Sequence, residues 1–149
     1  YQNISDTLKF ESKLNFVKTS LFGQISKKAL DNKLIASFGI RTDQNSYSKE
    51  MSNPLKQLSP RLSIAYAIAE KSSLNFNIGQ YFQLPAYTVM GHRNNENQLV
   101  NQENEITYIN NKQIVFGLET NPGNFSKVTV EGFHKKYENY PFLLGDMIS

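Results

Sequence analysis

The stretch from Leu34 to Arg41 reads Leu-Ile-Ala-Ser-Phe-Gly-Ile-Arg, and its side chains alternate with a period of two. The apolar set consists of Leu34, Ala36, Phe38 and Ile40. Only Ile35 interrupts the other set, which is formed by small and charged residues. Successive side chains of a strand point to opposite faces, whereas a helix repeats every 3.6 residues, so the pattern predicts a β-strand.

The same alternation recurs along the chain. Its apolar sets are Leu62, Ile64, Tyr66 and Ile68, then Leu74, Phe76 and Ile78, then Ile114, Phe116 and Leu118, then Val128 and Val130. With a less regular first segment, the pattern predicts six strands over residues 14–27, 33–48, 58–69, 73–84, 112–120 and 125–140. The fold class is therefore all-β, an antiparallel up-and-down meander of about six strands within one domain, residues 1–149.

The connections alternate in length. Residues 30–33, 70–73 and 121–124 are short connections, whereas residues 49–57 and 85–111 are long ones. In a meander every second connection lies at the same end of the sheet, so the short turns share one end and the long loops the other. Short turns at one end and long loops at the other are typical of outer-membrane barrels. We interpret the chain as a segment of a transmembrane β-barrel.

Composition excludes several other classes. The chain has no Cys, two His and a net charge of +3 that is spread along its length, so we expect no disulfide framework, metal site, cofactor or nucleic-acid partner. No nucleophile elbow, phosphate-binding glycine loop or paired-carboxylate signature is present, which argues against an enzyme. The sequence starts at Tyr1 without a signal-peptide pattern, so we expect any export signal to have been removed or to lie outside this piece.

The long connection 85–111 holds the candidate ligand-binding residues. It combines many Asn, Gln and Glu residues with Tyr87, His92, Arg93 and Tyr108. Such side chains offer hydrogen-bonding groups and stacking faces to a ligand. A mobile surface loop is the alternative interpretation of its segment 94–111, which is rich in Asn, Gln and Glu.

Five charged residues fall opposite the apolar sets of their strands: Arg41, Arg61, Glu119, Glu131 and Lys135. If the apolar face borders lipid, these side chains point into the lumen of a barrel, where they meet water and one another. On the lipid side, each Arg or Lys at mid-bilayer would cost roughly 2–4 kcal/mol. A half-buried sheet with a solvated outer face would give the same alternation.

Several strings resemble successive barrel strands of TonB-dependent outer-membrane receptors. They are Phe-Gly-Ile-Arg-Thr-Asp at 38–43, Leu-Ser-Pro-Arg-Leu-Ser-Ile-Ala-Tyr at 58–66, Gly-Gln-Tyr-Phe-Gln-Leu-Pro at 79–85, Phe-Gly-Leu-Glu at 116–119 and Val-Glu-Gly-Phe-His-Lys-Lys-Tyr at 130–137. Their order and spacing agree with that family over residues 16–140. Each string alone is a weak signal, but the five together are fairly specific.

The resemblance implies uptake of a scarce nutrient, such as a metal chelate, a cofactor or an oligosaccharide, across the outer membrane of a Gram-negative bacterium. It implies as partners the membrane lipid, a plug domain, the remaining barrel strands, the nutrient and a TonB complex. These receptors have 22 strands and a plugged lumen, whereas this chain has room for about six strands and contains no plug or TonB-contacting segment. The alternative function is that of a soluble all-β binding module, such as a carbohydrate-binding sandwich, in which the apolar faces form a core.

Overall fold

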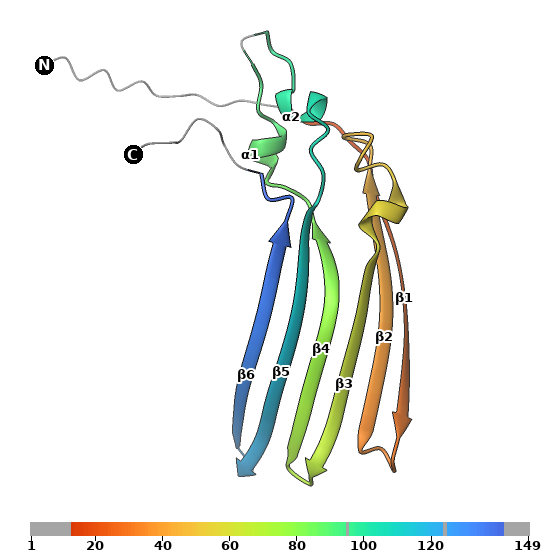
Figure 1. Cartoon of the computed structure of the whole chain (residues 1–149), viewed down its shortest axis with the longest axis vertical. Coiled ribbons are helices and arrows are strands. Elements are labelled where there is room, and N and C mark those ends of the chain that lie inside the picture. The colour runs from red at the N-terminus through yellow and green to blue at the C-terminus, as the bar shows by residue number, and fades with distance from the viewer. Residues whose placement is uncertain (1–12, 95, 124, 142–149) are drawn as a thin grey trace, which may run out of the picture.

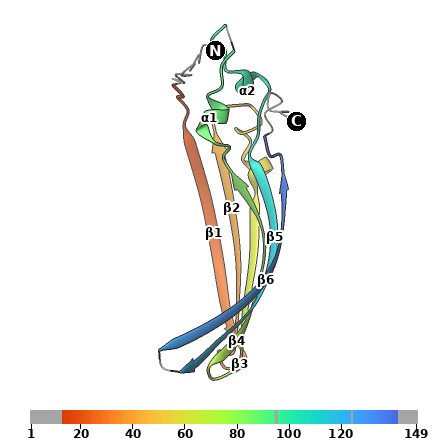
Figure 2. The same cartoon turned by 90° about the vertical axis from the view of Figure 1, so that its left-hand side faces the viewer.

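The chain forms one antiparallel sheet whose six strands follow one another in sequence order. The computed structural model describes residues 13–94, 96–123 and 125–141. The strands are β1 (Lys18–Ala29), β2 (Leu34–Asn45), β3 (Ser59–Ala69), β4 (Ser72–Gln83), β5 (Ile109–Gly123) and β6 (Ser126–Glu138). Figure 1 shows them side by side, and Figure 2 shows that the sheet is bowed. The predicted meander is confirmed, and the described residues form a single sheet that does not close on itself.

The alternating connection lengths are confirmed as well. The three hairpin turns lie at one end of the sheet, and the long connections lie at the other end with the short helices α1 (Tyr87–Met90) and α2 (Val100–Glu103) (Figure 1). We call these the hairpin end and the loop end. The first hairpin turns through Leu30, Asp31 and Asn32, which all have positive φ, and the Lys33 N–H donates to the Leu30 carbonyl.

Strand boundaries differ from the predicted ones near the loop end. β1 begins at Lys18 and not at residue 14, because Leu14 and Phe16 pack against buried residues of the loops. β2 ends at Asn45, whose side chain accepts a hydrogen bond from the Tyr47 N–H and so turns the chain. β5 is longer than predicted, because the backbone of its polar residue Asn111 pairs with Tyr81 although its side chain gives no apolar signal.

Strand register separates the two faces of the sheet. Residues that lie directly opposite one another form rows, and two neighbouring rows of the apolar face are Lys27, Ala36, Ile64, Phe76, Phe116 and Gly132, and Ile25, Phe38, Leu62, Ile78, Ile114 and His134. The row between them belongs to the opposite, polar face and reads Ser26, Ser37, Ser63, Asn77, Val115 and Phe133. The register therefore aligns the apolar residues of neighbouring strands into one continuous apolar surface.

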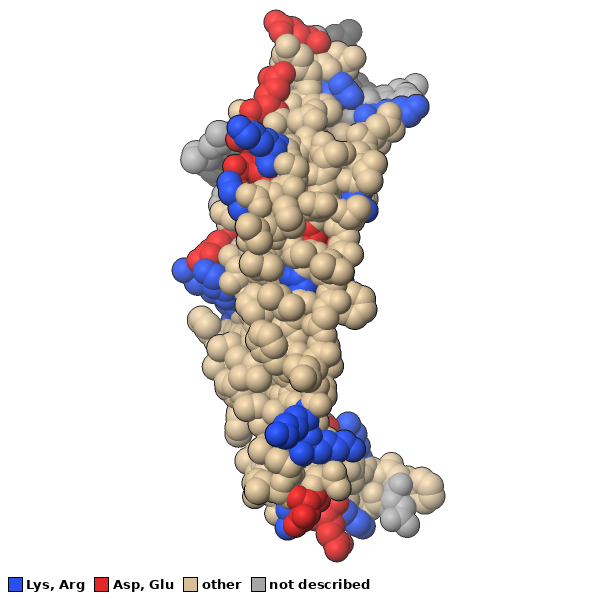
Figure 3. Space-filling model, turned by 90° about the vertical axis from the view of Figure 1, so that its right-hand side faces the viewer, with Lys and Arg blue, Asp and Glu red and all other residues tan. Residues whose placement is uncertain are grey.

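Much of this apolar surface is exposed in the chain by itself. Phe38, Phe116 and Val130 are 49%, 54% and 64% exposed, whereas a sandwich would bury such residues under a second sheet. Charged residues gather toward the two ends, and a band with few charges lies between them (Figure 3). Within the described residues, no helix has the length and apolar character needed to cross a membrane.

Candidate functional site

The two long connections fold together into a cap at the loop end, which we define as residues 46–58, 84–94 and 96–108. Its centre is a buried cluster of Tyr47, Met51, Met90 and Tyr108. The Tyr47 hydroxyl donates to the Met90 carbonyl at 2.6 Å and so joins the two connections. Asn45 at the end of β2 donates from Nδ2 to the Tyr108 hydroxyl at 2.8 Å and fixes the cap to the sheet.

Polar side chains of the cap bind distant backbone groups. The Gln102 amide donates to the Tyr47 carbonyl at 2.6 Å, and the Asn101 amide donates to the Val89 carbonyl at the same distance. The Ser48 hydroxyl donates to the Ile106 carbonyl at 3.1 Å. The Asn- and Gln-rich composition therefore has a structural role. The described residues of this connection form two helical turns around a common core.

Burial also disfavours the ionised form of the two cap tyrosines. Loss of water raises the pKa of Tyr47 and of Tyr108 above the usual value of a tyrosine. Both hydroxyls keep their protons at neutral pH, as an ordinary tyrosine does, and Tyr47 is a hydrogen-bond donor to the Met90 carbonyl.

Of the four candidate ligand-binding residues of the loop, Tyr87, His92 and Arg93 reach the surface, whereas Tyr108 is buried. Tyr87 is 64% exposed on α1, and its ring lies 6.2 Å from the Phe16 ring. His92 is exposed and Arg93 is half-buried, with its guanidinium donating to the Asn97 carbonyl at 2.6 Å. Tyr108 is only 1% exposed. Tyr108 therefore offers no surface to a ligand. Its aromatic ring is packed in the buried cluster of the cap.

All five charged candidates of the strands share the polar face. Arg61 lies opposite Gly39 and Gly79, Glu131 lies opposite Gly117, and Lys135 lies opposite Gln113. Arg41 and Glu119 have the same parity in their own strands. Glu119 pairs with Lys127 at 2.9 Å, and the Lys135 ammonium lies 5.0 Å from the centre of the Phe133 ring.

Asp43 completes the polar face below the cap and was not among the sequence candidates. Its carboxylate accepts two hydrogen bonds from Arg41, at 2.7 and 2.8 Å, and one from the Ser20 hydroxyl at 2.6 Å. Asp43 is 4% exposed, and Arg41 supplies the positive charge that makes such burial tolerable. The spacing of two residues, which places Arg41 and Asp43 on one face of a strand, is the signal that could have identified the pair.

The Arg61 side chain contacts the Tyr81 ring, and the absence of a side chain at Gly79 makes room for that ring. Its guanidinium lies 4.4 Å from the centre of the Tyr81 ring, within the range of a cation–π contact. The Tyr81 ring in turn covers Gly79, since a Cβ added at Gly79 would lie 3.0 Å from that ring. Absence of a side chain at position 79 thus lets Tyr81 lie flat beside Arg61.

We therefore expect Gly79→Val to lower the free energy of unfolding by about 1 kcal/mol, because the new side chain displaces Tyr81 from Arg61. Gly132→Val is the matched control, since a Cβ at Gly132 meets nothing within 4 Å. The control is expected to be neutral or slightly stabilising, because valine suits a strand better than glycine. Chemical unfolding of the purified full-length receptor measures both, and equal losses would contradict the role of Tyr81.

Among the described residues there is no group of three or more His, Cys, Asp or Glu side chains that could hold a metal ion. The arrangement offers instead a polar face with fixed cations and a cap with exposed aromatic and basic groups.

Comparison with known proteins found no matching curated protein and no matching solved structure. A family model described as TonB dependent receptor-like, beta-barrel matches residues 2–149. The chain, with its two-faced meander and loop-end cap, belongs to this family of outer-membrane receptor barrels.

Proposed function

We propose that these six strands form part of the wall of an outer-membrane transport barrel that takes up a scarce nutrient, with energy supplied through a TonB partner. The apolar face borders lipid and the polar face borders the lumen. The observation that carries this proposal is the separation of the two faces by register, together with membership of a family of transporters. A metal chelate, a cofactor and an oligosaccharide are the nutrient classes to be tested.

The position of the charges on the apolar face supports a tilted barrel wall. On β1 the charged residue is Lys27, which lies in the row toward the hairpin end. On β5 and β6 the charged residues are Lys112, Lys136 and Glu138, which lie toward the loop end. The uncharged band therefore crosses the strands diagonally. Such a course follows if the strands tilt relative to the membrane normal, as those of membrane barrels do by about 35–45°.

The polar face suits a lumen that holds a plug domain. Arg61 lies on β3, and Glu131 and Lys135 lie on β6, so contact with another protein surface would use both signs of charge. Arg41 and Asp43 neutralise each other below the cap. The proposed partners are therefore a plug domain inside the barrel, further strands at the edges of β1 and β6, and lipid outside.

The cap is the proposed region of ligand capture at the extracellular rim. Tyr87, His92 and Arg93 lie close together in sequence and follow the end of β4. Tyr87 and His92 are exposed, and they combine a stacking face with hydrogen-bonding nitrogens. The buried cluster beneath them supplies a fixed support, which keeps the cost of ordering on binding low.

Uptake by cells that express the full-length receptor tests this function. Labelled ferric chelates, cobalt-containing cofactors and oligosaccharides are supplied one at a time, with and without a functional TonB partner. We expect one class to be taken up, and only when TonB is present. Uptake that does not depend on TonB would contradict the proposal.

Substitution of the cap tests where the nutrient binds. Tyr87→Ala combined with His92→Ala is expected to raise the half-saturating nutrient concentration about tenfold, since loss of one stacking contact and one hydrogen bond costs about 1.4 kcal/mol. Phe125→Ala is the control, because Phe125 is an even more exposed aromatic residue and lies at the hairpin end, away from the cap. An unchanged half-saturating concentration in the double variant would remove the cap from ligand capture.

A further inference from the structure

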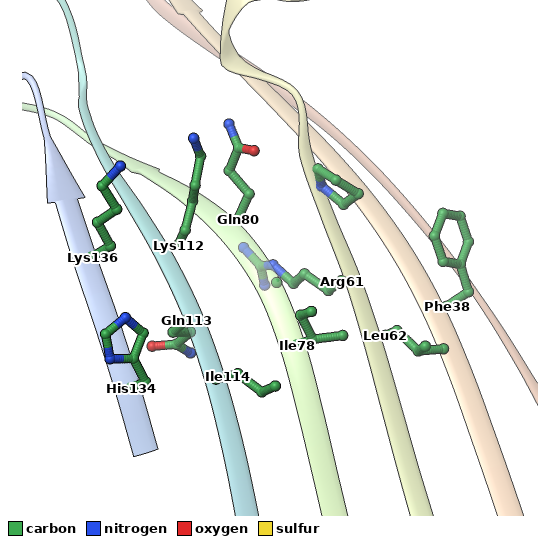
Figure 4. A pocket seen from close by; sticks show the side chains of 12 residues that line it. Phe38, Arg61, Leu62, Ile78, Gln80, Lys112, Gln113, Ile114, His134 and Lys136 are labelled. Atoms are coloured by element: carbon green, nitrogen blue, oxygen red, sulfur yellow. The ribbon is translucent and has the colours of Figure 1, made fainter.

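A hollow of about 540 Å³ lies on the apolar face, near the loop end. Its floor is one row of the sheet, formed by Phe38, Leu62, Ile78 and Ile114 from β2 to β5. Figure 4 shows Leu62, Ile78 and Ile114 along the floor, with Phe38 at one side. The hollow therefore offers an elongated apolar surface that crosses several strands.

Cationic groups border this hollow on the side of the loops. Lys112 and Lys136 lie directly opposite each other on β5 and β6, one position beyond the floor row on the same face. Both contact Glu138, with Nζ–Oε distances of 2.8 Å and 2.9 Å. One carboxylate thus holds two ammonium groups, and the three side chains keep a net positive charge. His134 ends the floor row on β6 (Figure 4).

The combination matches the chemistry of an anionic lipid. Acyl chains gain free energy by covering apolar side chains, and a phosphate gains from nearby ammonium groups. Long lysine side chains can keep their stems on the apolar surface while the charge reaches the polar boundary. Glu138 would orient the two lysines, and their excess positive charge is what a phosphate complements. Arg61 also lines the hollow, whereas Lys135 does not.

We propose that the hollow binds a phosphate-bearing anionic membrane lipid, whose acyl chain covers Phe38, Leu62, Ile78 and Ile114 and whose phosphate contacts Lys112 and Lys136. This inference rests on the proposed function, because it requires the apolar face to border the membrane. The proposal adds a specific lipid-binding site to an apolar face that would otherwise contact only the acyl chains of the membrane. The site lies where the uncharged band of the sheet meets the first lysines of the loop end.

The test uses the full-length receptor in a neutral detergent. Phosphatidylglycerol, phosphatidylcholine and inorganic phosphate are titrated separately, and bound species are counted by native mass spectrometry. We expect phosphatidylglycerol to bind more tightly than phosphatidylcholine. Lys112→Gln combined with Lys136→Gln should weaken phosphatidylglycerol binding roughly 25-fold, at about fivefold for each lysine.

Lys127→Gln combined with Lys135→Gln is the matched control, since it removes two lysines of β6 from the polar face. The control should bind phosphatidylglycerol like the unchanged receptor. Equal binding of the two phospholipids, or equal losses in the two double variants, would overturn the lipid site. Displacement of phosphatidylglycerol by millimolar phosphate alone would show an anion site without lipid specificity and would also overturn it. Outer-membrane insertion is scored separately in cells, so failure of the barrel proposal is distinguishable from failure of the lipid site.

Discussion

Ile64→Arg is expected to abolish assembly of the full-length receptor in the outer membrane, whereas Ser63→Arg is expected to leave assembly intact. Ile64 lies opposite Ala36 and Phe76 on the apolar face. Ser63 lies opposite Ser37 and Asn77 on the polar face. An arginine facing the middle of the bilayer costs roughly 2–4 kcal/mol, and an arginine facing a watery lumen avoids that cost.

The assay is the amount of receptor in outer-membrane fractions and its heat-modifiable migration on gels. The two substitutions are neighbours in β3 and introduce the same side chain, so each controls for the other. Ile64→Val serves as a further control for loss of the native side chain, and it should assemble normally. Equal effects of arginine at positions 63 and 64 would remove the assignment of one face to lipid and the other to the lumen.

The second large effect is expected in the cap. Tyr108→Ala removes a ring that is 1% exposed and leaves the Asn45 amide without the Tyr108 hydroxyl as acceptor. Truncating a buried aromatic residue costs about 3 kcal/mol or more. We expect the cap to open about a hundredfold more often, while the strands below remain paired. The measurement is the rate at which trypsin added to intact cells cleaves after Arg93.

Two variants calibrate this result. Tyr108→Phe keeps the ring and removes only the hydroxyl, so it should cost about 1 kcal/mol. Tyr87→Ala truncates an exposed tyrosine of the same cap and should leave the cleavage rate nearly unchanged. If Tyr108→Ala is cleaved no faster than Tyr87→Ala, the buried cluster does not hold the cap together.

Apolar periodicity predicted most of the meander, because five of the six strands carry their own two-residue pattern and only the first is less regular. Leu62, Ile64 and Tyr66 indicate both the strand and its apolar face without knowledge of any partner strand. The start of β5 could not be found in this way, since Asn110 and Asn111 pair through their backbone and have no apolar side chains. Strand pairing is a property of two segments, and a local pattern reports only one of them.

The cap was beyond sequence reasoning for a related reason. Gln102 binds the backbone of Tyr47, which lies 55 residues away, and Tyr47 binds the backbone of Met90. Such contacts depend on how the loop end brings the two connections together. A polar composition alone is equally consistent with a mobile segment. The same limit explains why the burial of Tyr108 was not predicted, because an aromatic residue in a polar segment suits a ligand-binding surface and a small core alike.

The central claim is that the apolar face borders lipid and the polar face borders water in an assembled barrel. The chain has no Cys, so single cysteines can be placed at positions 62–69 of β3, with any cysteine elsewhere in the full-length receptor replaced. Each cysteine carries a nitroxide label, and collisions with oxygen and with a water-soluble nickel chelate are measured in bilayers. We predict alternation with a period of two, in which Leu62, Ile64, Tyr66 and Ile68 collide with oxygen and the intervening positions collide with nickel. Equal access of nickel to both sets, or an alternation of the opposite phase, would contradict the account.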